Sequence, residues 1–276
     1  MKVTASEHRE RMSYLDLPIR SFRRLGRIIL MACHEMGQAL IMLASSTLYI
    51  RTLWRPRARY ETSMQLYITG IKSLGVITVV AMFTGMILAL QTGLELRRYG
   101  QEEFIGSAVA VSMIREMGPF MTGLIIAASV GSAIAAQLGT MTVSEEIAAL
   151  EVMSIDPHRF LVMPRLVALA VMMPILTIYT NLIGIFGGGV VGSTQLGVAF
   201  QAYLDNATRY AENKDLYVGL LKALVFGVII ATVACHQGLT TSEGAVGVGR
   251  ATRRTVIISF LLILIVGYMI TRLFYI

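Results

Sequence analysis

The sequence predicts an all-α protein that crosses a membrane several times, and three observations support this. The chain of 276 residues is 55% hydrophobic and only 15% charged, whereas a soluble domain is nearer a quarter charged. Its apolar stretches are long and continuous, unlike the short alternating segments of a membrane β-barrel. Since an unpaired backbone amide costs several kcal/mol in lipid, such stretches cross the membrane as helices.

Residues 1–60 are predicted to form an N-terminal tail and an interfacial helix or elbow on the cytosolic surface. The tail is polar and charged, so we expect no cleaved signal peptide. The apolar run that follows is interrupted by His34 and Glu35 and lies between basic clusters at 20–27 and 51–59. A spanning helix would place one cluster outside, against the positive-inside rule, whereas an interfacial helix keeps both inside. A sixth span is the alternative.

Residues 61–276 are predicted to form one domain of five spans. The expected spans cover 66–94, 108–138, 161–193, 217–237 and 255–275. A short external turn joins the first two spans, the polar stretch 139–160 is internal, and a longer polar stretch, 194–215, is external. Most of the 24 Lys and Arg residues then fall on the cytosolic side, as the positive-inside rule requires when the N-terminus is inside and the C-terminus outside.

Small residues recur at four-residue spacing in two of the predicted spans. The second span carries Gly123, Ala127, Gly131, Ala135 and Gly139, with Ala128, Ser132 and Ala136 beside them, and the third carries Gly184, Gly188 and Gly192. In lipid, small residues let helix backbones approach closely. We favour packing within one subunit, and a face shared with a second copy is the alternative.

An ionisable pair, Arg115 and Glu116, stands at the outer start of the second span. Ionisable groups in membranes are expensive and need a partner. Tyr99 and two arginines lie close by in the external turn, while Leu88 and Leu96 would form an apolar wall below. This combination predicts an outward-facing mouth that suits an amphiphile better than an ion. The alternative is that both charged side chains simply reach water at the interface.

A short cytosolic helix at about 142–156, between the second and third spans, is predicted to couple the chain to a partner. Thr142 and Glu145 have the spacing of a capping box, and Pro157 ends the helix. The apolar stripe consists of Ile147, Leu150 and Met153, and the polar side of Glu145, Glu146 and Glu151. Such a helix can lay its apolar side into a partner's groove. A simple amphipathic loop helix is the alternative.

Other classes of function find less support. The sequence has no GxxxxGK(S/T) phosphate-binding loop, so any ATPase must be a separate chain, and no cofactor is expected here. Cys33 and Cys235 lack metal-ligand spacing and are predicted to be buried. Basic residues flank apolar segments, so nucleic-acid binding is not expected. His34 has no metal-binding partner at useful spacing and HExxH is absent, so no metal site is expected. An intramembrane hydrolase using Ser129 or Ser132 with His236 is a weaker hypothesis.

Several ordered motifs carry a family resemblance. They are REMGPF from Arg115, GSAIAAQLGTMTVSEEIAALEVMSIDP from Gly131, the PR of VMPRLVAL, GMILALQ and VGRATRRTV. From about residue 20 to the C-terminus the chain resembles the MlaE-type permeases, the membrane subunits of ABC complexes that move phospholipids between the inner membrane and the outer envelope. The chain departs from the usual pattern at Ser129, where the family has Arg, and at Gln137, where it has Glu.

The resemblance implies an interfacial helix, five spans and a homodimer in a bacterial inner membrane, with the N-terminus cytosolic. It also implies a cytosolic ABC ATPase on the loop between spans two and three, and an MCE-domain subunit on the periplasmic side. A small cytosolic accessory subunit is a further candidate partner. Carried over by position, Leu88, Leu96, Tyr99, Arg115 and Glu116 would line the lipid cavity, and Glu145, Glu146 and Leu150 would lie on the coupling helix. The alternative function is a secondary transporter or channel for a small amphiphile.

Overall fold

The computed structural model describes residues 26, 30, 33–49 and 56–275, and the statements below concern those residues. They form helices and connecting turns, with no β-strand among them. Five of the described helices are long and apolar enough to cross a membrane: Arg59–Arg98, Glu102–Val143, His158–Thr194, Asn213–Leu239 and Gly244–Tyr275. Each predicted span lies within one of these five. The prediction of an all-α, multi-pass membrane protein is therefore confirmed.

The chain divides into two compact units, Met1–Ala44 and Ser45–Ile276. In the first unit the described residues 33–44 are helical, and most of them are exposed. Of the two basic clusters that support the prediction of an interfacial helix, Arg20, Arg23, Arg24, Arg27, Arg51 and Arg55 lie outside the described residues, whereas Arg57 and Arg59 lie in the helix Pro56–Thr69. The placement of this helix on a membrane surface stays a prediction.

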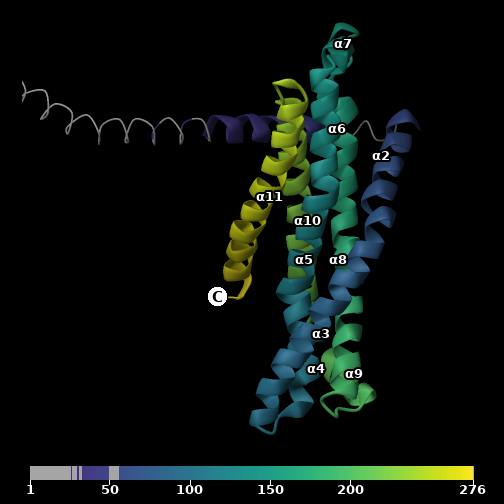
Figure 1. Cartoon of the computed structure of the whole chain (residues 1–276), viewed down its shortest axis with the longest axis vertical. Helices are drawn as coiled ribbons and strands as arrows, with labels where there is room; N and C mark the ends of the chain where they lie inside the picture. The colour runs from purple at the N-terminus through teal and green to yellow at the C-terminus, as the bar shows by residue number, and fades with distance from the viewer. Residues whose placement is uncertain (1–25, 27–29, 31–32, 50–55, 276) are drawn as a thin grey trace, which may run out of the picture. The chain divides into compact units, whose positions relative to one another are not determined.

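The larger unit contains all five spans (Figure 1). The first span consists of α2 (Pro56–Thr69), η2 (Ile71–Ser73) and α3 (Leu74–Arg98). The second consists of η3 (Glu102–Phe104), α4 (Ile105–Ser112), η4 (Met113–Met117), α5 (Gly118–Ile126), η5 (Ala127–Gly131) and α6 (Ser132–Val143). The chain continues as α7 (Glu146–Val152), η6 (His158–Val162), α8 (Met163–Thr194), α9 (Phe200–Arg209), α10 (Asn213–Leu239) and α11 (Gly244–Tyr275). Helices α7 and α9 mark opposite ends of this unit, here called the α7 end and the α9 end.

Helix α8 packs against α2, α3 and α10, and the α3 contact is especially close. A Cβ atom built on Gly85 of α3 would lie 1.8 Å from the carbonyl oxygen of Gly184 on α8. The two backbones therefore touch at a point where any side chain would separate them. Close backbone approach of this kind is how helices gain contact energy in lipid, where burial of apolar surface gives no net driving force.

The small residues of the second span pack inside the subunit. Ala127 and Ala135 are fully buried. A Cβ atom on Gly131 would lie 3.0 Å from the Ile230 side chain of α10. The parallel positions 128, 132 and 136 are exposed or half-buried. Packing within one subunit is thus confirmed for the first set, while the second set lies on the surface of the chain.

Helix α9 lies in the polar stretch for which the sequence analysis predicted no helix. Its Tyr203 is fully buried, and that burial raises the pKa of the phenol well above its usual value. The ring lies on the glycine stripe of α8: a Cβ on Gly188 would lie 2.6 Å from the Tyr203 hydroxyl, and one on Gly192 would lie 3.3 Å from the ring. The third-span glycines therefore serve packing within the subunit as well.

Two local predictions are wrong. The first is the capping box. Thr142 lies near the end of α6 and does not begin the next helix, and its hydroxyl donates to the carbonyls of Leu138 and Gly238 at 2.8 and 3.1 Å. Glu145 precedes α7 in a left-handed conformation, with φ of 61°, and no side chain caps that helix. The chain turns sharply here, so α6 and α7 cannot form one helix.

The second wrong prediction concerns the cysteines. Both were predicted to be buried, but Cys33 is exposed, whereas Cys235 is buried as predicted.

Candidate functional site

The second span contains two π-helical turns, and Arg115 and Glu116 lie in the first of them, η4. Pro119 contributes to this irregularity, because proline has no backbone N–H to donate to the carbonyl of Arg115 four residues earlier. The ammonium group of Lys222 on α10 donates to that carbonyl instead, with 2.8 Å between Nζ and O. Such turns are rare and frequently mark functional sites. Here the turn brings two charged side chains against α10.

Glu116 joins three helical segments through one carboxylate oxygen. Lys222 Nζ of α10 and Thr271 Oγ1 of α11 each donate to Glu116 Oε1 at 2.7 Å. The Lys222 side chain is only 1% exposed, whereas that of Glu116 is 44% exposed. The carboxylate therefore compensates a buried ammonium group, which would otherwise be very costly at this depth.

Arg115 forms a second ion pair beside the first. Its Nε lies 2.7 Å from Oδ1 of the fully buried Asp215, and the Tyr275 hydroxyl donates to the same oxygen at 2.7 Å. The guanidinium also lies 4.7 Å from the centre of the Tyr275 ring, within cation–π range. We call the whole set the ion-pair network: Arg115, Glu116, Asp215, Lys222, Thr271 and Tyr275.

A largely apolar pocket of about 350 Å³ opens beside this network. It is lined by Glu116, Met117 and Phe120 of the second span, Lys222 and Phe226 of α10, and Ile263, Leu264, Gly267, Tyr268 and Thr271 of α11. We call it the apolar pocket. Ligand pockets generally have roughly 300–1,000 Å³, mostly apolar walls and a few polar groups. Charged groups next to apolar walls match an amphiphile.

The five residues predicted to line an amphiphile-binding mouth are not all brought together. Glu116 lines the apolar pocket, and Arg115 lies in the adjoining network. Leu88 and Leu96 pack instead against a separate buried cluster that contains Tyr203. Tyr99 is 77% exposed at the turn that follows α3. Within the described part of one chain, these side chains do not surround a single cavity.

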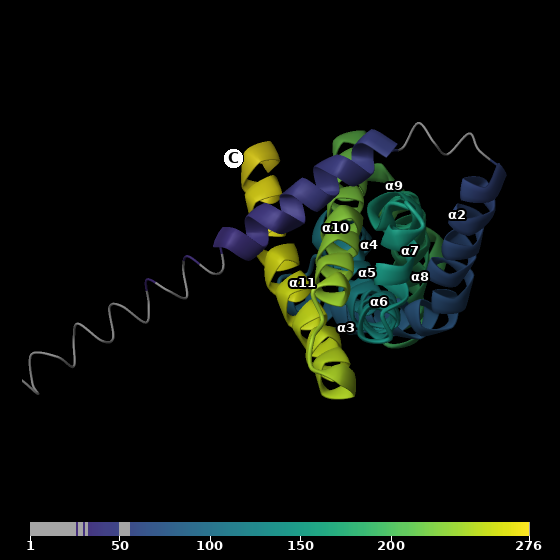
Figure 2. The same cartoon turned by 90° about the horizontal axis from the view of Figure 1, so that it is seen from above.

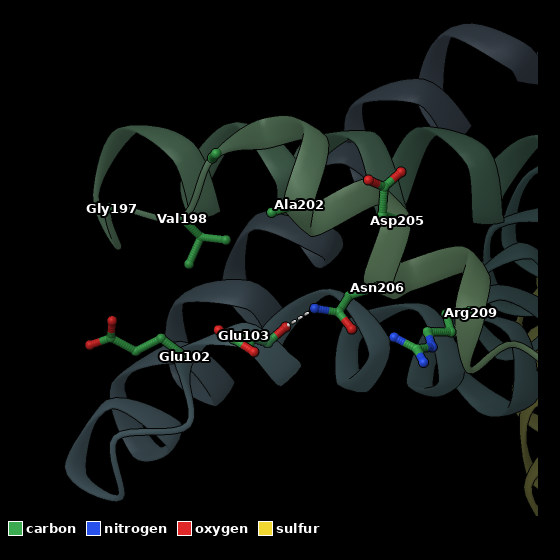
Figure 3. Close-up of a pocket in the computed structure, with 9 residues that line it drawn as sticks. Glu102, Glu103, Gly197, Val198, Ala202, Asp205, Asn206 and Arg209 are labelled. Atoms are coloured by element: carbon green, nitrogen blue, oxygen red, sulfur yellow. Dashed lines mark hydrogen bonds between the residues drawn. The ribbon is translucent and has the colours of Figure 1, made fainter.

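A second hollow, of about 510 Å³, lies at the α9 end between η3 and α9 (Figure 3). It is lined by Glu102, Glu103, Gly197, Val198, Ala199, Ala202, Asp205, Asn206 and Arg209. Asn206 Nδ2 donates to the Glu103 carbonyl at 2.5 Å, which ties α9 to η3. This hollow is too polar to hold an acyl chain. Among the described residues, no group of three or more His, Cys, Asp and Glu could hold a metal ion.

Sequence reasoning missed four members of the network: Asp215, Lys222, Thr271 and Tyr275. Lys222 carried a usable signal, because it falls within the predicted fourth span and an ionisable residue at such depth is a functional candidate by default. Thr271 and Tyr275 carried no such signal. A hydroxyl or an aromatic near the end of a span is common, and only the crossing of α11 over α10 shows which carboxylates they meet.

The predicted coupling residues lie in and beside α7, which has no buried residue. Ile147 and Leu150 are half-buried, whereas Glu145, Glu146, Glu151, Val152, Met153 and Ile155 are exposed. Val152 and Met153, at 86% and 61% exposure, are large apolar side chains in a polar connection between spans. The α7 end therefore presents an apolar surface that nothing in the described chain covers.

Comparison with known proteins identifies the family. Residues 62–273, most of the chain, match the family model described as permease MlaE. The chain belongs to the MlaE permease family. A probable ABC transporter permease protein of Rickettsia prowazekii is 43% identical to this permease over 211 residues, covering 76% of the chain and 82% of the relative.

Two further relatives extend the comparison. The intermembrane phospholipid transport system permease protein MlaE of Haemophilus influenzae is 31% identical over 257 residues, covering 91% of this chain and 96% of the relative. The chloroplastic protein TRIGALACTOSYLDIACYLGLYCEROL 1 of Arabidopsis thaliana is 33% identical over 239 residues, covering 87% of this chain and 66% of the relative. This MlaE-family ABC transporter permease is thus a non-catalytic transport subunit, and the family implies an ATPase partner.

The hydrolase hypothesis has no support from this assignment. The hydroxyls of Ser129 and Ser132 donate to the carbonyls of Ile125 and Ala128 one turn earlier, at 2.7 and 2.5 Å. Serines that bond back to their own helix are an ordinary feature of membrane spans.

Proposed function

We propose that this permease moves phospholipids, with the Glu116–Lys222 end of the apolar pocket meeting the polar part of the lipid. The observation that carries the proposal is the juxtaposition of the ion-pair network and the apolar pocket in one site. A phospholipid has a charged headgroup on apolar chains, so it needs both kinds of surface within a few ångströms. The name of the Haemophilus relative supports the same class of substrate.

The energy for transport comes from a separate ATPase that docks at the α7 end. The family assignment supports such a partner, and the sequence holds no phosphate-binding loop of its own. The exposed Val152 and Met153 provide the apolar contact that a docking helix needs. A ligand or nucleotide shifts a two-state protein only through different affinities for the two states. ATP on the partner would therefore favour one shape of the pocket over the other.

The assembly is a homodimer in a bacterial inner membrane, with its N-terminus cytosolic and an MCE-domain subunit at the α9 end. Bacterial relatives that match most of the chain support the location. The uncovered small residues at 128, 132 and 136 support the second copy, because close helix contact in lipid requires small side chains. A small accessory subunit on the cytosolic side completes the proposed complex.

The decisive experiment is ATP-driven lipid transfer. The permease, purified from native membranes with its bound subunits, is reconstituted into vesicles that contain a fluorescent phospholipid. We expect a co-purified ATPase and MCE-domain protein, and transfer that needs ATP hydrolysis. Transfer driven by a proton gradient without any partner would support the alternative of a secondary transporter. Neither kind of transfer, in a sample that hydrolyses ATP, would contradict a lipid substrate.

A further inference from the structure

Helix α11 contacts the rest of the bundle along one narrow stripe. The stripe residues recur at every fourth position and are Gly247, Ala251, Thr255, Ser259, Ile263 and Gly267. Only 17% of the most apolar stretch of α11 is buried, against 61% for the third and fourth spans. In Figures 1 and 2 the helix crosses the bundle obliquely, and in Figure 1 its last turn lies well short of the α9 end. Beyond this stripe, most of α11 faces away from the rest of the described chain.

The same four-residue spacing continues into two hydroxyl side chains, Thr271 and Tyr275. Each donates a hydrogen bond of 2.7 Å to a carboxylate on another helix, Thr271 to Glu116 and Tyr275 to Asp215. The Thr271 hydroxyl also lies 2.9 Å from the Gly267 carbonyl one turn earlier, so its single proton is shared between the longer contact within α11 and the shorter one to Glu116. At the last two turns of α11, the contact thus changes from small side chains to hydrogen bonds with charged groups. Hydrogen bonds to charged groups are stronger than neutral ones.

The α11 wall of the apolar pocket lies directly before these turns and meets them at Thr271. Ile263, Leu264, Gly267, Tyr268 and Thr271 line the pocket from α11, opposite Phe120 and Phe226. Gly267 lies directly on Phe226, since a Cβ there would be 3.2 Å from the ring. Because Thr271 belongs both to this wall and to the ion-pair network, a displacement of α11 at Thr271 changes the width of the pocket and at the same time removes a donor from Glu116.

We propose that Thr271 and Tyr275 are positioning residues of the lipid site. Their hydroxyls hold the carboxylates of Glu116 and Asp215 in place, and in doing so they fasten the last turns of α11 as a movable wall of the apolar pocket. The wall is closed while both hydrogen bonds exist and swings outward when they break. The role of these residues toward lipid rests on the proposed function, whereas the fastening of α11 does not.

Hydrogen exchange measures the fastening directly. The full complex in nanodiscs is compared with Thr271→Val, Tyr275→Phe and the double variant, following peptides from 264–275 and, as an internal reference, from 247–259. We expect exchange in the first segment to rise roughly tenfold or more for each lost bond, because hydrogen bonds to charged groups are stronger than neutral ones. The reference segment should not change. Thr271→Ser, which keeps the hydroxyl, should restore slow exchange.

Lipid contact is measured in the same samples with a photo-reactive amino acid at position 120. We expect a severalfold fall in phospholipid labelling in the double variant and recovery in Thr271→Ser. Thr255→Val is the matched control, because Thr255 lies on the same stripe and its hydroxyl donates only within α11, to the Ala251 carbonyl. It should leave both measurements unchanged. If the double variant does not assemble, the single variants decide.

Three outcomes are informative in different ways. Unchanged exchange in 264–275 would overturn the fastening of α11. Faster exchange with unchanged lipid labelling would overturn the positioning role. Absence of labelling in the unsubstituted protein would contradict the proposed lipid function, while the exchange data would still decide whether the two hydroxyls hold α11.

Discussion

Lys222 lies behind Glu116, with its ammonium nitrogen 2.7 Å from the carboxylate, and its side chain is 1% exposed where that of Glu116 is 44% exposed. The cation is covered and the anion faces the apolar pocket. Lys222 also donates to the Arg115 carbonyl that Pro119 leaves without a helical donor. One buried side chain thus completes both an ion pair and an irregular turn of the backbone.

Replacing Lys222 with Met should destabilise the permease. The substitution keeps the length of the side chain but leaves Glu116 without its cation and the Arg115 carbonyl without a donor. We expect a loss of about 1–3 kcal/mol, the usual penalty for leaving a buried polar group unsatisfied. Thermal unfolding in detergent measures it. The double variant Lys222→Met with Glu116→Gln should recover part of the loss, because the unpaired charge is gone. If the double variant recovered no stability, the loss in Lys222→Met would come from something other than the unpaired charge of Glu116.

Glu116→Lys should abolish lipid handling without preventing assembly. It places a second ammonium group beside Lys222 at the mouth of the pocket, where like charges repel and each resists removal from water. Glu116 is partly exposed, so the new side chain can turn toward the pocket and the complex still assembles, although loss of the ion pair with the buried Lys222 lowers its thermal stability. ATP-driven lipid transfer and size-exclusion profiles measure the two effects. Glu116→Gln is the milder control, and we expect reduced transfer. Normal transfer by the Lys variant would remove Glu116 from the site.

The architecture followed from the sequence because length, apolarity and charge bias act on whole spans. Each of the five predicted spans lies inside one observed helix. The ends were less accurate, since α3 continues to Arg98, beyond the predicted end of the first span at 94, although the turn to the second span is short as predicted. Helix α9 was missed because its stability comes from Tyr203 packed on the glycines of α8. That contact spans the sequence and leaves little local pattern.

The candidate site could be predicted only in part. Arg115 and Glu116 are unusual for their position, so the sequence alone marks them. Their partners come from α10 and α11, and which residues of these helices reach Arg115 and Glu116 depends on how the helices cross. The sequence analysis placed Leu88 and Leu96 as an apolar wall below the charged pair, from their place in the first span and from the family resemblance. The structure shows that they pack against a different cluster, because nearness to the same end of the bundle does not mean a shared face.

Gly118→Ala should destabilise the turn that carries the charged pair. A Cβ atom there would lie 1.8 Å from Asn181 Oδ1 of α8, and Met113 O is 2.9 Å away. We expect a loss of about 1–3 kcal/mol, as for other overpacked sites. Adding Asn181→Ala removes the nearer obstacle and should restore part of it. Gly75→Ala in α3 is the control, since nothing lies within 4 Å of its added methyl. Gly75→Ala should be neutral or slightly stabilising, because Ala is the better helix former; equal stability of the two variants would show that there is no clash at position 118.

Met153→Asp should weaken binding of the ATPase while the permease itself remains folded. Met153 is exposed in the isolated chain, so a carboxylate there meets water until a partner covers it. Covering an unpaired charge is costly, and co-purification of the ATPase should fall about tenfold or more, which corresponds to 1.4 kcal/mol. Val246→Asp is the control, since Val246 is equally exposed near the start of α11. If both variants lost the ATPase equally, the contact would not be specific to α7 and the prediction would be wrong.

Gln137→Glu should stabilise the chain through Arg165. The Arg165 side chain is 5% exposed, yet among the described residues its guanidinium donates only to the neutral oxygens of Gln137, at 3.0 Å, and of the Leu161 carbonyl, at 2.6 Å. A glutamate would turn the first of these into a charge-assisted bond, the stronger kind. We expect a gain of about 1–2 kcal/mol, measured by thermal unfolding. Gln137→Ala, which removes the acceptor, should shift stability the other way. A less stable Glu variant would mean that the exposed side of Gln137 is covered by apolar surface in the assembled protein, where a carboxylate is worse than the unmet charge of Arg165.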